Sequence, residues 1–264
     1  MVRDPAVAGR FYAAEPAALA REVDGFLAAP AARGPALGVV APHAGYVYSG
    51  AIAGAVYARV DVPAKVIVLA PNHTGLGADA SLWPDGGWRT PLGMVPVDAD
   101  LTAALAASPL VTRDVEAHRR EHALEVQLPF LQRARPGVAL AALCLGHLRL
   151  RDCEALGRHV AAAAAAEGAL VVASSDMSHY LPAPDARAKD GRALERLLAL
   201  DAEGLYDVVR REEISMCGII PVTVMLVAAR LRGATRAELV RYGHSGEVTG
   251  DDRSVVGYAG VVVS

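Results

Sequence analysis

Val66-Ile67-Val68-Leu69-Ala70-Pro71-Asn72-His73 is the stretch that decides the fold. Its apolar, largely β-branched start is typical of a strand buried on both faces, and the proline and polar residues that follow end the strand. Two other segments repeat this plan. Val39-Val40-Ala41 leads into Pro42-His43, and Val171-Val172-Ala173 leads into a polar segment that reaches His179. Each of these strands is therefore followed by a histidine.

Short β-branched runs alternate with longer Ala- and Leu-rich stretches along the chain, which predicts an α/β fold with a mostly parallel central sheet flanked by helices. The predicted strands, of which the first four are expected to be buried on both faces, are residues 36–41, 65–70, 138–145, 170–173, 238–242 and 254–263. The predicted helices are residues 16–28, 49–60, 100–107, 115–133, 152–167, 186–200, 202–212 and 218–232. Turn-forming residues predict a long hairpin loop over 244–252 and an inserted β-turn or hairpin over 81–93.

The composition indicates one globular domain over residues 1–264. Hydrophobic residues make up 53% of the chain and charged residues 21%, which is typical of a chain with a large core and not of a disordered one. The 26 basic and 29 acidic residues give a net charge of −3. A chain with net negative charge does not attract a phosphate backbone overall, so nucleic acid is not an expected partner.

The sequence contains no apolar run long enough to cross a membrane. The longest nearly apolar stretch, residues 219–229, is far shorter than the roughly 18 residues that a span requires. No hydrophobic signal segment follows Met1, so we expect a cytoplasmic protein. Three cysteines cannot all pair, and in a reducing compartment they are expected to be thiols.

The three strand-end histidines, His43, His73 and His179, are expected to meet, because ligands of open parallel sheets bind outside the carboxyl ends of the strands. Two imidazoles and one anionic ligand form the common site of non-haem metal enzymes. The residues alone leave two candidates for the anionic ligand, Asp176 and Cys217. Cys217 precedes an apolar helix, whose N-terminal amides are expected to stabilise a thiolate. Cys144 and Cys153 are interpreted as structural.

A second motif offers a different chemistry. His118-Arg119-Arg120-Glu121-His122 matches the H-x-x-E-H signature of inverted zinc peptidases. Glu121 and Glu125 are expected on one face of the helix predicted over 115–133, where either could border the histidine crevice. Ser174-Ser175-Asp176 near His179 suggests a serine triad, but no strand–turn–helix nucleophile elbow surrounds either serine.

At these residues the sequence resembles the Memo family, whose microbial members are called AmmeMemoRadiSam system protein B. The matching blocks span nearly the whole chain and together are specific. They are Pro5-Ala6-Val7-Ala8-Gly9-Arg10-Phe11-Tyr12, Pro42-His43-Ala44-Gly45-Tyr46-Val47-Tyr48-Ser49-Gly50, Pro71-Asn72-His73-Thr74-Gly75, Glu121-His122-Ala123-Leu124-Glu125-Val126-Gln127-Leu128-Pro129-Phe130, Ser174-Ser175-Asp176-Met177-Ser178-His179-Tyr180, Cys217-Gly218 and Val256-Gly257-Tyr258-Ala259. Ala123 stands where the family commonly has serine.

The resemblance implies a fold similar to class III extradiol dioxygenases, in which iron activates oxygen. In that comparison His43 and His73 are metal ligands, Cys217 replaces the dioxygenases' glutamate, and His179 matches their acid–base histidine. A thiolate is softer than a carboxylate, which favours iron, copper(I) or zinc and changes the electron density available to bound oxygen. The residues expected to bind substrate or to support the ligands are Asp176, Glu121, His122 and Tyr46.

Two functions follow from the resemblance. The first is an iron- or copper-dependent oxidoreductase, with zinc as a further candidate metal and His179 as the catalytic residue that moves protons. The second is a non-catalytic adaptor that uses the same cleft to bind a peptide or protein. By the same resemblance the expected partners are a radical-SAM protein and an AMMECR-type protein.

Overall fold

The computed structural model describes residues 1–28 and 32–264 and contains a large mixed sheet. Its order is β10-β12-β2-β9-β3-β8-β4-β7, with β11 paired to β12. The four central strands, β2, β9, β3 and β8, are parallel to one another. Their bounds are β2 Gly38–Ala41, β9 Leu170–Ser174, β3 Lys65–Pro71 and β8 Ala139–Leu145. The predicted α/β class with a mostly parallel sheet is confirmed.

Antiparallel strands extend both edges of this parallel centre. On one side β12 (Val255–Val263) pairs with β2 and also with β11 (Ala237–His244) and β10 (His179–Leu181). On the other side β4 (Ala80–Leu82) is antiparallel to β8 and parallel to β7 (Thr112–Arg113). The hairpin predicted around 244–252 joins β11 to β12 and contains the short helix α10 (Gly246–Thr249).

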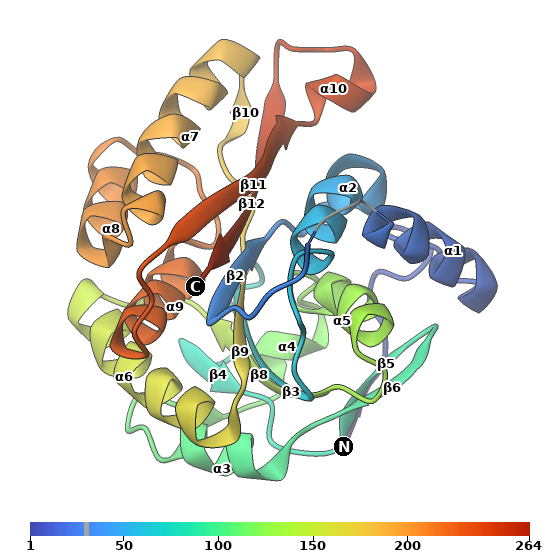
Figure 1. The fold of residues 1–264 in the computed structure, drawn as a ribbon, viewed down its shortest axis with the longest axis vertical. Coiled ribbons are helices and arrows are strands. Elements are labelled where there is room, and N and C mark those ends of the chain that lie inside the picture. Colours follow the sequence, from blue (N-terminus) through green and yellow to red (C-terminus); the bar gives the residue numbers. More distant parts are fainter. Residues whose placement is uncertain (29–31) are drawn as a thin grey trace.

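Helices cover both faces of the sheet (Figure 1). One layer holds α3 (Ala99–Ala106), α6 (Leu150–Glu167), α8 (Ala202–Arg211) and α9 (Ile219–Leu231), and α7 (Ala183–Leu198) lies beside β12. The opposite layer holds α1 (Pro16–Leu27), α2 (Tyr46–Tyr57) and α5 (Leu128–Ala134). Apart from α5, the predicted termini of these helices lie within three residues of the observed ones. α2 and α7 show the largest shift, and both start three residues earlier than predicted. At the start of α2, Tyr46 N donates to Phe11 O at 2.7 Å.

Strand periodicity divides the interior into two cores. Ile67 and Leu69 of β3 pack into the core under α6 and α9, whereas Val66 and Val68 pack into the core under α2 and α5. The same alternation holds in β2, β8 and β9. Successive side chains of a strand point to opposite faces, so a strand covered on both sides is apolar throughout. The four central strands are buried on both faces, as predicted.

A small separate sheet carries the predicted hairpin. Its order is β1 (Val2–Arg3), β5 (Gly87–Thr90) and β6 (Gly93–Pro96). The hairpin turn falls between β5 and β6, a few residues after the Pro84–Gly87 turn chemistry on which the prediction rested. Trp88 is fully buried at the centre of this sheet, where the Arg3 guanidinium lies 4.8 Å from its ring centroid.

The prediction of a single helix over 115–133 is wrong. The structure has α4 (Glu116–Arg119), a short 3-10 helix (Glu125–Gln127) and α5 in its place. The cause is that the Glu121 carboxylate accepts hydrogen bonds from the backbone N–H groups of His122 and Ala123, at 2.8 and 2.9 Å. A side chain that satisfies the backbone locally competes with the helical hydrogen bonds.

Glu125 is fully buried beside the N-terminal segment. Its carboxylate pairs with Arg3 and accepts hydrogen bonds from Tyr12 Oη at 2.5 Å and from Ala6 N at 2.8 Å. Arg3 also donates to the carbonyl oxygen of Glu121. Glu125 therefore anchors the N-terminal segment and does not border the histidine crevice, contrary to the expectation that Glu121 and Glu125 share a helix face.

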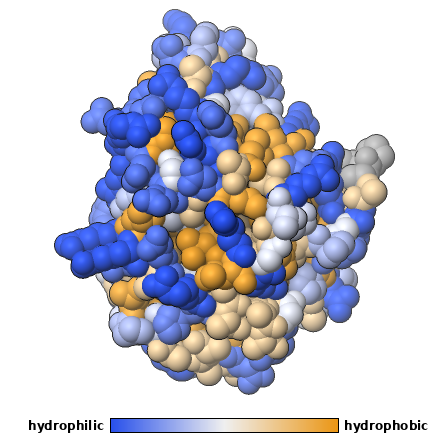
Figure 2. Space-filling view, turned by 60° about the vertical axis from the view of Figure 1, so that its left-hand side comes forward, coloured by the Kyte–Doolittle hydropathy of each residue, from blue (hydrophilic) through white to orange (hydrophobic). Residues whose placement is uncertain are grey.

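The surface of the molecule is mostly hydrophilic on the face drawn in Figure 2, with hydrophobic side chains gathered toward its middle. Among the described residues, no helix combines the length and the hydrophobicity that crossing a bilayer would require.

The buried Arg3–Glu125 pair generates a stability prediction. Glu125→Gln leaves the Arg3 charge buried without its counterion, so we expect the free energy of unfolding to fall by about 3–5 kcal/mol. Urea denaturation measures this change. The control is Asp24→Asn, which removes an exposed pair with Arg133 and should cost at most about 1 kcal/mol. Equal losses in the two variants would contradict the prediction.

Candidate metal centre

His43 follows β2 and is almost fully buried. Its backbone N–H donates to Asp176 Oδ1 at 2.8 Å, and its Nδ1 lies 2.8 Å from Ser174 Oγ. The Ser174 hydroxyl donates its single hydrogen to Ala123 O at 2.7 Å, so the proton of the His43–Ser174 hydrogen bond must come from Nδ1. The unprotonated Nε2 of His43 then faces Cys217, whose Sγ is 3.2 Å away.

The charge state of His43 suits a metal ligand. Burial lowers its pKa well below the ordinary value, and positive charge on His73, His122 or His179 lowers it further. The ring is therefore neutral near pH 7. A neutral imidazole whose second nitrogen is fixed by a hydrogen bond is the usual form of histidine in metal sites.

His73 follows β3 and is held by Glu121. Its Nδ1 donates to Glu121 Oε1 at 2.9 Å, and its backbone N–H donates to Glu121 Oε2 at 2.6 Å. Burial by itself lowers the pKa of His73, but the hydrogen bond and charge of Glu121 together raise it above the ordinary value. Glu121 is 1% exposed; burial raises its pKa, and its donors more than reverse this effect, so the carboxylate is ionised.

Cys217 lies in the turn that precedes α9 and is partly buried. Asp176 N–H donates to its Sγ at 3.3 Å. Burial raises the pKa of the Cys217 thiol, and the nearby charge of Asp176 raises it further. The expectation that the helix N-terminus stabilises a thiolate is therefore corrected: without a cation, Cys217 is a thiol that donates toward His43 Nε2.

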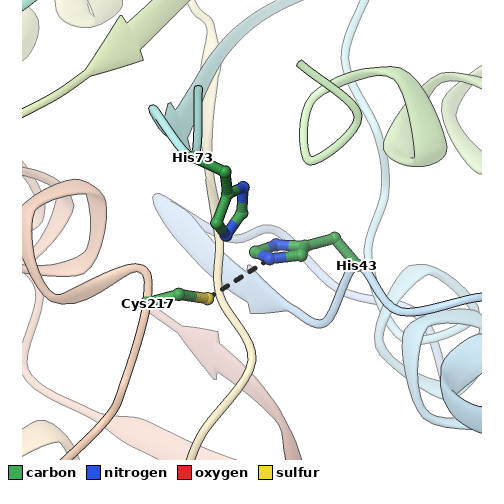
Figure 3. Close-up of side chains that lie close together, drawn as sticks. All are labelled: His43, His73 and Cys217. Carbon is green, nitrogen blue, oxygen red and sulfur yellow. Dashed lines mark hydrogen bonds between the residues drawn. The ribbon is translucent and has the colours of Figure 1, made fainter. Parts of the chain in front are cut away.

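One ligand atom from each of His43, His73 and Cys217 lies within 4.8 Å of the others, and Figure 3 shows both rings and the sulfur directed to a common point. Bonds of about 2.0–2.3 Å in a tetrahedral site separate such donors by roughly 3.5 Å. The observed spacing is thus close to that of a metal site. The chemistry of the set, two imidazoles and one thiol, fits iron, copper or zinc.

Two other clusters of potential ligands occur in the described residues. His73, Glu121 and His122 form one, which shares His73 with the first. Asp98, Asp100 and Glu167 form the other, but the ammonium group of Lys65 lies 2.7 Å from Glu167 Oε2 and 2.9 Å from Asp98 Oδ2. This acidic cluster therefore already has its cation.

Asp176 lies beside His43, and His179 is held by Ser215. Burial raises the pKa of Asp176 to about 6, and its Oδ2 is 4.0 Å from His43 Nε2. His179 Nδ1 donates to Ser215 O at 2.9 Å, and the His179 backbone N–H donates to Ser215 Oγ at 2.8 Å. Because a carbonyl oxygen only accepts, Nε2 of neutral His179 carries a free lone pair.

His122 and Tyr46 have different environments. The His122 ring stacks on His73 with centroids 4.9 Å apart and meets His43 edge-on at 5.5 Å. Tyr46 is buried, donates from Oη to Val126 O at 2.7 Å, and packs against Phe130. His122 therefore borders the proposed ligands, as expected, whereas Tyr46 packs in the core under α2.

The H-x-x-E-H motif does not form a zinc-peptidase site. His118 is buried with its ring edge-on to Trp83 and Trp88, at 5.8 and 5.7 Å, and its Nε2 lies 3.1 Å from Ser81 O. His122 stacks on His73 instead. The break after α4 separates the two histidines that the peptidase motif requires on one continuous helix.

Supporting residues of the site were missed by the sequence analysis. Gln127 donates from Nε2 to Ser174 Oγ and Pro42 O, both at 2.9 Å, and so links the ends of β2 and β9. Ser215 positions His179. The sequence signal for Gln127 is its place within a matching block, and the signal for Ser215 is its place two residues before one. Their roles depend on contacts between distant segments, which no local pattern contains. Ser174 itself bonds to Ala123 O and His43, which leaves it no place in a serine triad.

The site thus belongs to an α/β protein with two imidazoles and a thiol at the carboxyl ends of parallel strands. The Memo-like protein family model matches residues 3–262. MEMO1 family proteins of Methanothermobacter thermautotrophicus and Aquifex aeolicus are each 40% identical to this chain, over 98% and 99% of it and 99% and 98% of their own lengths. One from Methanosarcina barkeri is 42% identical over 99% of this chain and its full length. The chain belongs to the Memo family.

A solved structure of an uncharacterised protein from Escherichia coli K12 aligns with a TM-score of 0.48 and 19% identity, over 74% of this chain and 85% of that one. Likeness at this level identifies no activity.

His118 generates a prediction of acid stability. Burial lowers its pKa to about 4, below its value of about 6.5 in an unfolded chain. Between these values the unfolded state binds more protons, so His118 makes stability fall as pH falls from about 6.5 to about 4, by about 3 kcal/mol in total. His118→Gln should remove this part of the loss. Urea denaturation at several pH values measures it, and parallel curves for the variant and wild type would refute it.

Proposed function

We propose that this protein binds a redox-active metal, iron or copper, through His43 Nε2, His73 Nε2 and Cys217 Sγ, and acts as an oxidoreductase. The observation that carries the proposal is the convergence of these three donors, which come from β2, β3 and the turn before α9. An adaptor that only grips a partner needs no such convergence. The presence of a hydrogen-bonded Nδ1 on both histidines adds support, because it fixes the tautomer that leaves Nε2 free.

A bound iron or copper ion would supply a Lewis-acid and redox centre with coordination positions open to substrate. The protein's own groups then have separate tasks. Ser174 and Glu121 hold the two imidazoles through Nδ1. Cys217 would coordinate the cation as a thiolate, with its proton released to solvent, because metal ligation requires the deprotonated sulfur. His179 accepts a substrate proton at Nε2, since Ser215 O holds the proton on Nδ1.

Metal content tests the proposal. We expect tag-free protein to hold about one iron or copper ion per chain by elemental analysis, and His73→Ala and Cys217→Ala to lose it. His118→Gln is the matched control, because it changes a buried histidine of the H-x-x-E-H motif outside the donor set, and it should retain metal. His179→Gln should also retain metal, since His179 is assigned to proton transfer. Undiminished metal content in His73→Ala and Cys217→Ala would exclude the assignment.

A substitution at Glu121 tests the same site through metal affinity, which it should lower without abolishing. Glu121→Gln weakens the acceptor that orients His73, and second-sphere changes of this kind typically lower metal affinity by about 10–100-fold. Competition with a chromophoric chelator measures the affinity. Glu116→Gln, which affects only an exposed pair with Arg119, should bind metal like the wild type. A Glu121→Gln affinity within twofold of the wild type would show that His73 does not depend on this hydrogen bond.

A further inference from the structure

A cavity of about 460 Å³ opens beside the proposed metal centre. It lies between the ends of β3 and β8 on one side and the connection from α8 to α9 on the other, and both His73 and Cys217 line it. Sites for small molecules usually measure about 300–1,000 Å³. The cavity is therefore large enough for a small organic molecule, and one end of that molecule would meet the metal ligands.

The wall formed by the end of α8, the α8–α9 connection and the start of α9 is largely apolar. Its hydrophobic lining residues are Val209, Ile214, Met216, Ile219 and Ile220. Most of these side chains are buried parts of the core, so the wall has a fixed shape. A hydrocarbon segment of a ligand would replace water along this wall with a favourable free-energy change.

Arg210 provides the positive charge of the cavity. Its guanidinium carbon lies 5.0 Å from the ring centroid of Tyr206, whose Oη is fixed by a hydrogen bond to Leu148 O. Within residues 1–28 and 32–264, the guanidinium has no ion-pair partner or side-chain hydrogen bond. Stacking on a ring leaves the in-plane N–H donors free, and their fork geometry matches a carboxylate.

Glu213 provides a negative charge three residues further along the chain, in the turn after α8. Its backbone has φ +50°, a strained value for a residue with a side chain. Lys189 Nζ holds this turn by donating to Glu212 O at 2.9 Å and to Glu213 O at 3.3 Å. In the described part of the chain the Glu213 carboxylate has no cation within ion-pair distance. Asp79, across the cavity, adds a second carboxylate, which accepts from His147 N.

We propose that this cavity is the substrate subsite of the metal centre and takes a small zwitterion with an apolar body. The substrate's carboxylate would bind Arg210, its ammonium group would bind Glu213, and its body would lie along Ile214, Met216 and Ile220 toward His73 and Cys217. The assignment rests on the proposed function for the part that places the body at the metal. The Arg210 guanidinium and the Glu213 carboxylate at one end of the cavity, with Asp79 as a second carboxylate across it, carry the choice of a zwitterion over a simple acid or amine.

Three probes of equal chain length test this assignment: L-norleucine, hexanoate and n-hexylamine. Ligand-observed NMR gives their dissociation constants for metal-free protein and for protein loaded with cobalt(II). L-Norleucine should bind best. Arg210→Gln should weaken the binding of L-norleucine and hexanoate about fivefold, because each exposed charge pair contributes up to about 1 kcal/mol. The same variant should leave the affinity for n-hexylamine unchanged. Glu213→Gln should weaken the binding of L-norleucine and n-hexylamine and leave the affinity for hexanoate unchanged. Arg211→Gln and Glu195→Gln, on the neighbouring exposed surfaces, are the controls.

The visible absorption spectrum of the cobalt(II)-loaded protein tests whether the cavity adjoins the metal. L-Norleucine should shift the visible bands of the cobalt-loaded protein with the same dissociation constant that NMR reports. Two results would overturn the zwitterion subsite and leave the metal proposal standing. In the first, cobalt-loaded protein binds none of the probes. In the second, the Arg210→Gln and Glu213→Gln variants bind the probes as tightly as the wild type does. Charge-dependent binding without a spectral shift would overturn the placement beside the metal. Charge-dependent binding by a chain that takes up no metal would support the zwitterion cavity and reject the oxidoreductase.

Discussion

The carboxylate of Glu121 is the constraint on which the rest of the site depends. It accepts four hydrogen bonds from two segments that are distant in sequence, from the backbone and ring of His73 and from the backbone of His122 and Ala123. This one buried group joins the end of β3 to the segment before α5, interrupts the helix there and selects the tautomer of His73. Arg3 binds the Glu121 carbonyl oxygen as well, so the N-terminal strand supports the same junction.

The central strands could be predicted from sequence because burial on both faces leaves a strong local signal. The runs that end at Ala41, Ala70 and Ala173 were apolar and β-branched, and their carboxyl ends meet as the strand-end rule requires. Residues 115–133 could not be predicted correctly. Their apolar spacing is helical, but the competing interaction comes from a carboxylate whose other partners lie on His73, about fifty residues away, and no local pattern contains that contact.

The residues of the candidate site were likewise predictable only in part. Local sequence indicated His43, His73 and His179, while it left Asp176 and Cys217 as alternatives for the third ligand. The position of Cys217 depends on the turn that Lys189 and Ser215 hold, so its distance of 3.2 Å from His43 Nε2 is a property of the tertiary structure. The family resemblance favoured Cys217 by comparison with known members. Tyr46 lay within a matching block and yet packs in the core, which shows that a motif can mark folding as well as chemistry.

The order of the strands also affects biosynthesis. β2, near the start of the chain, is hydrogen-bonded on one side to β9 and on the other to β12, the last strand. His43 therefore emerges from the ribosome long before the segments that fix its ring and supply the sulfur opposite. A nascent chain presents separated histidines and a protonated thiol, which bind ions weakly and without selectivity. An ion that requires all three donors can consequently be bound only after the segment that carries Cys217 has been synthesised and has folded onto the sheet.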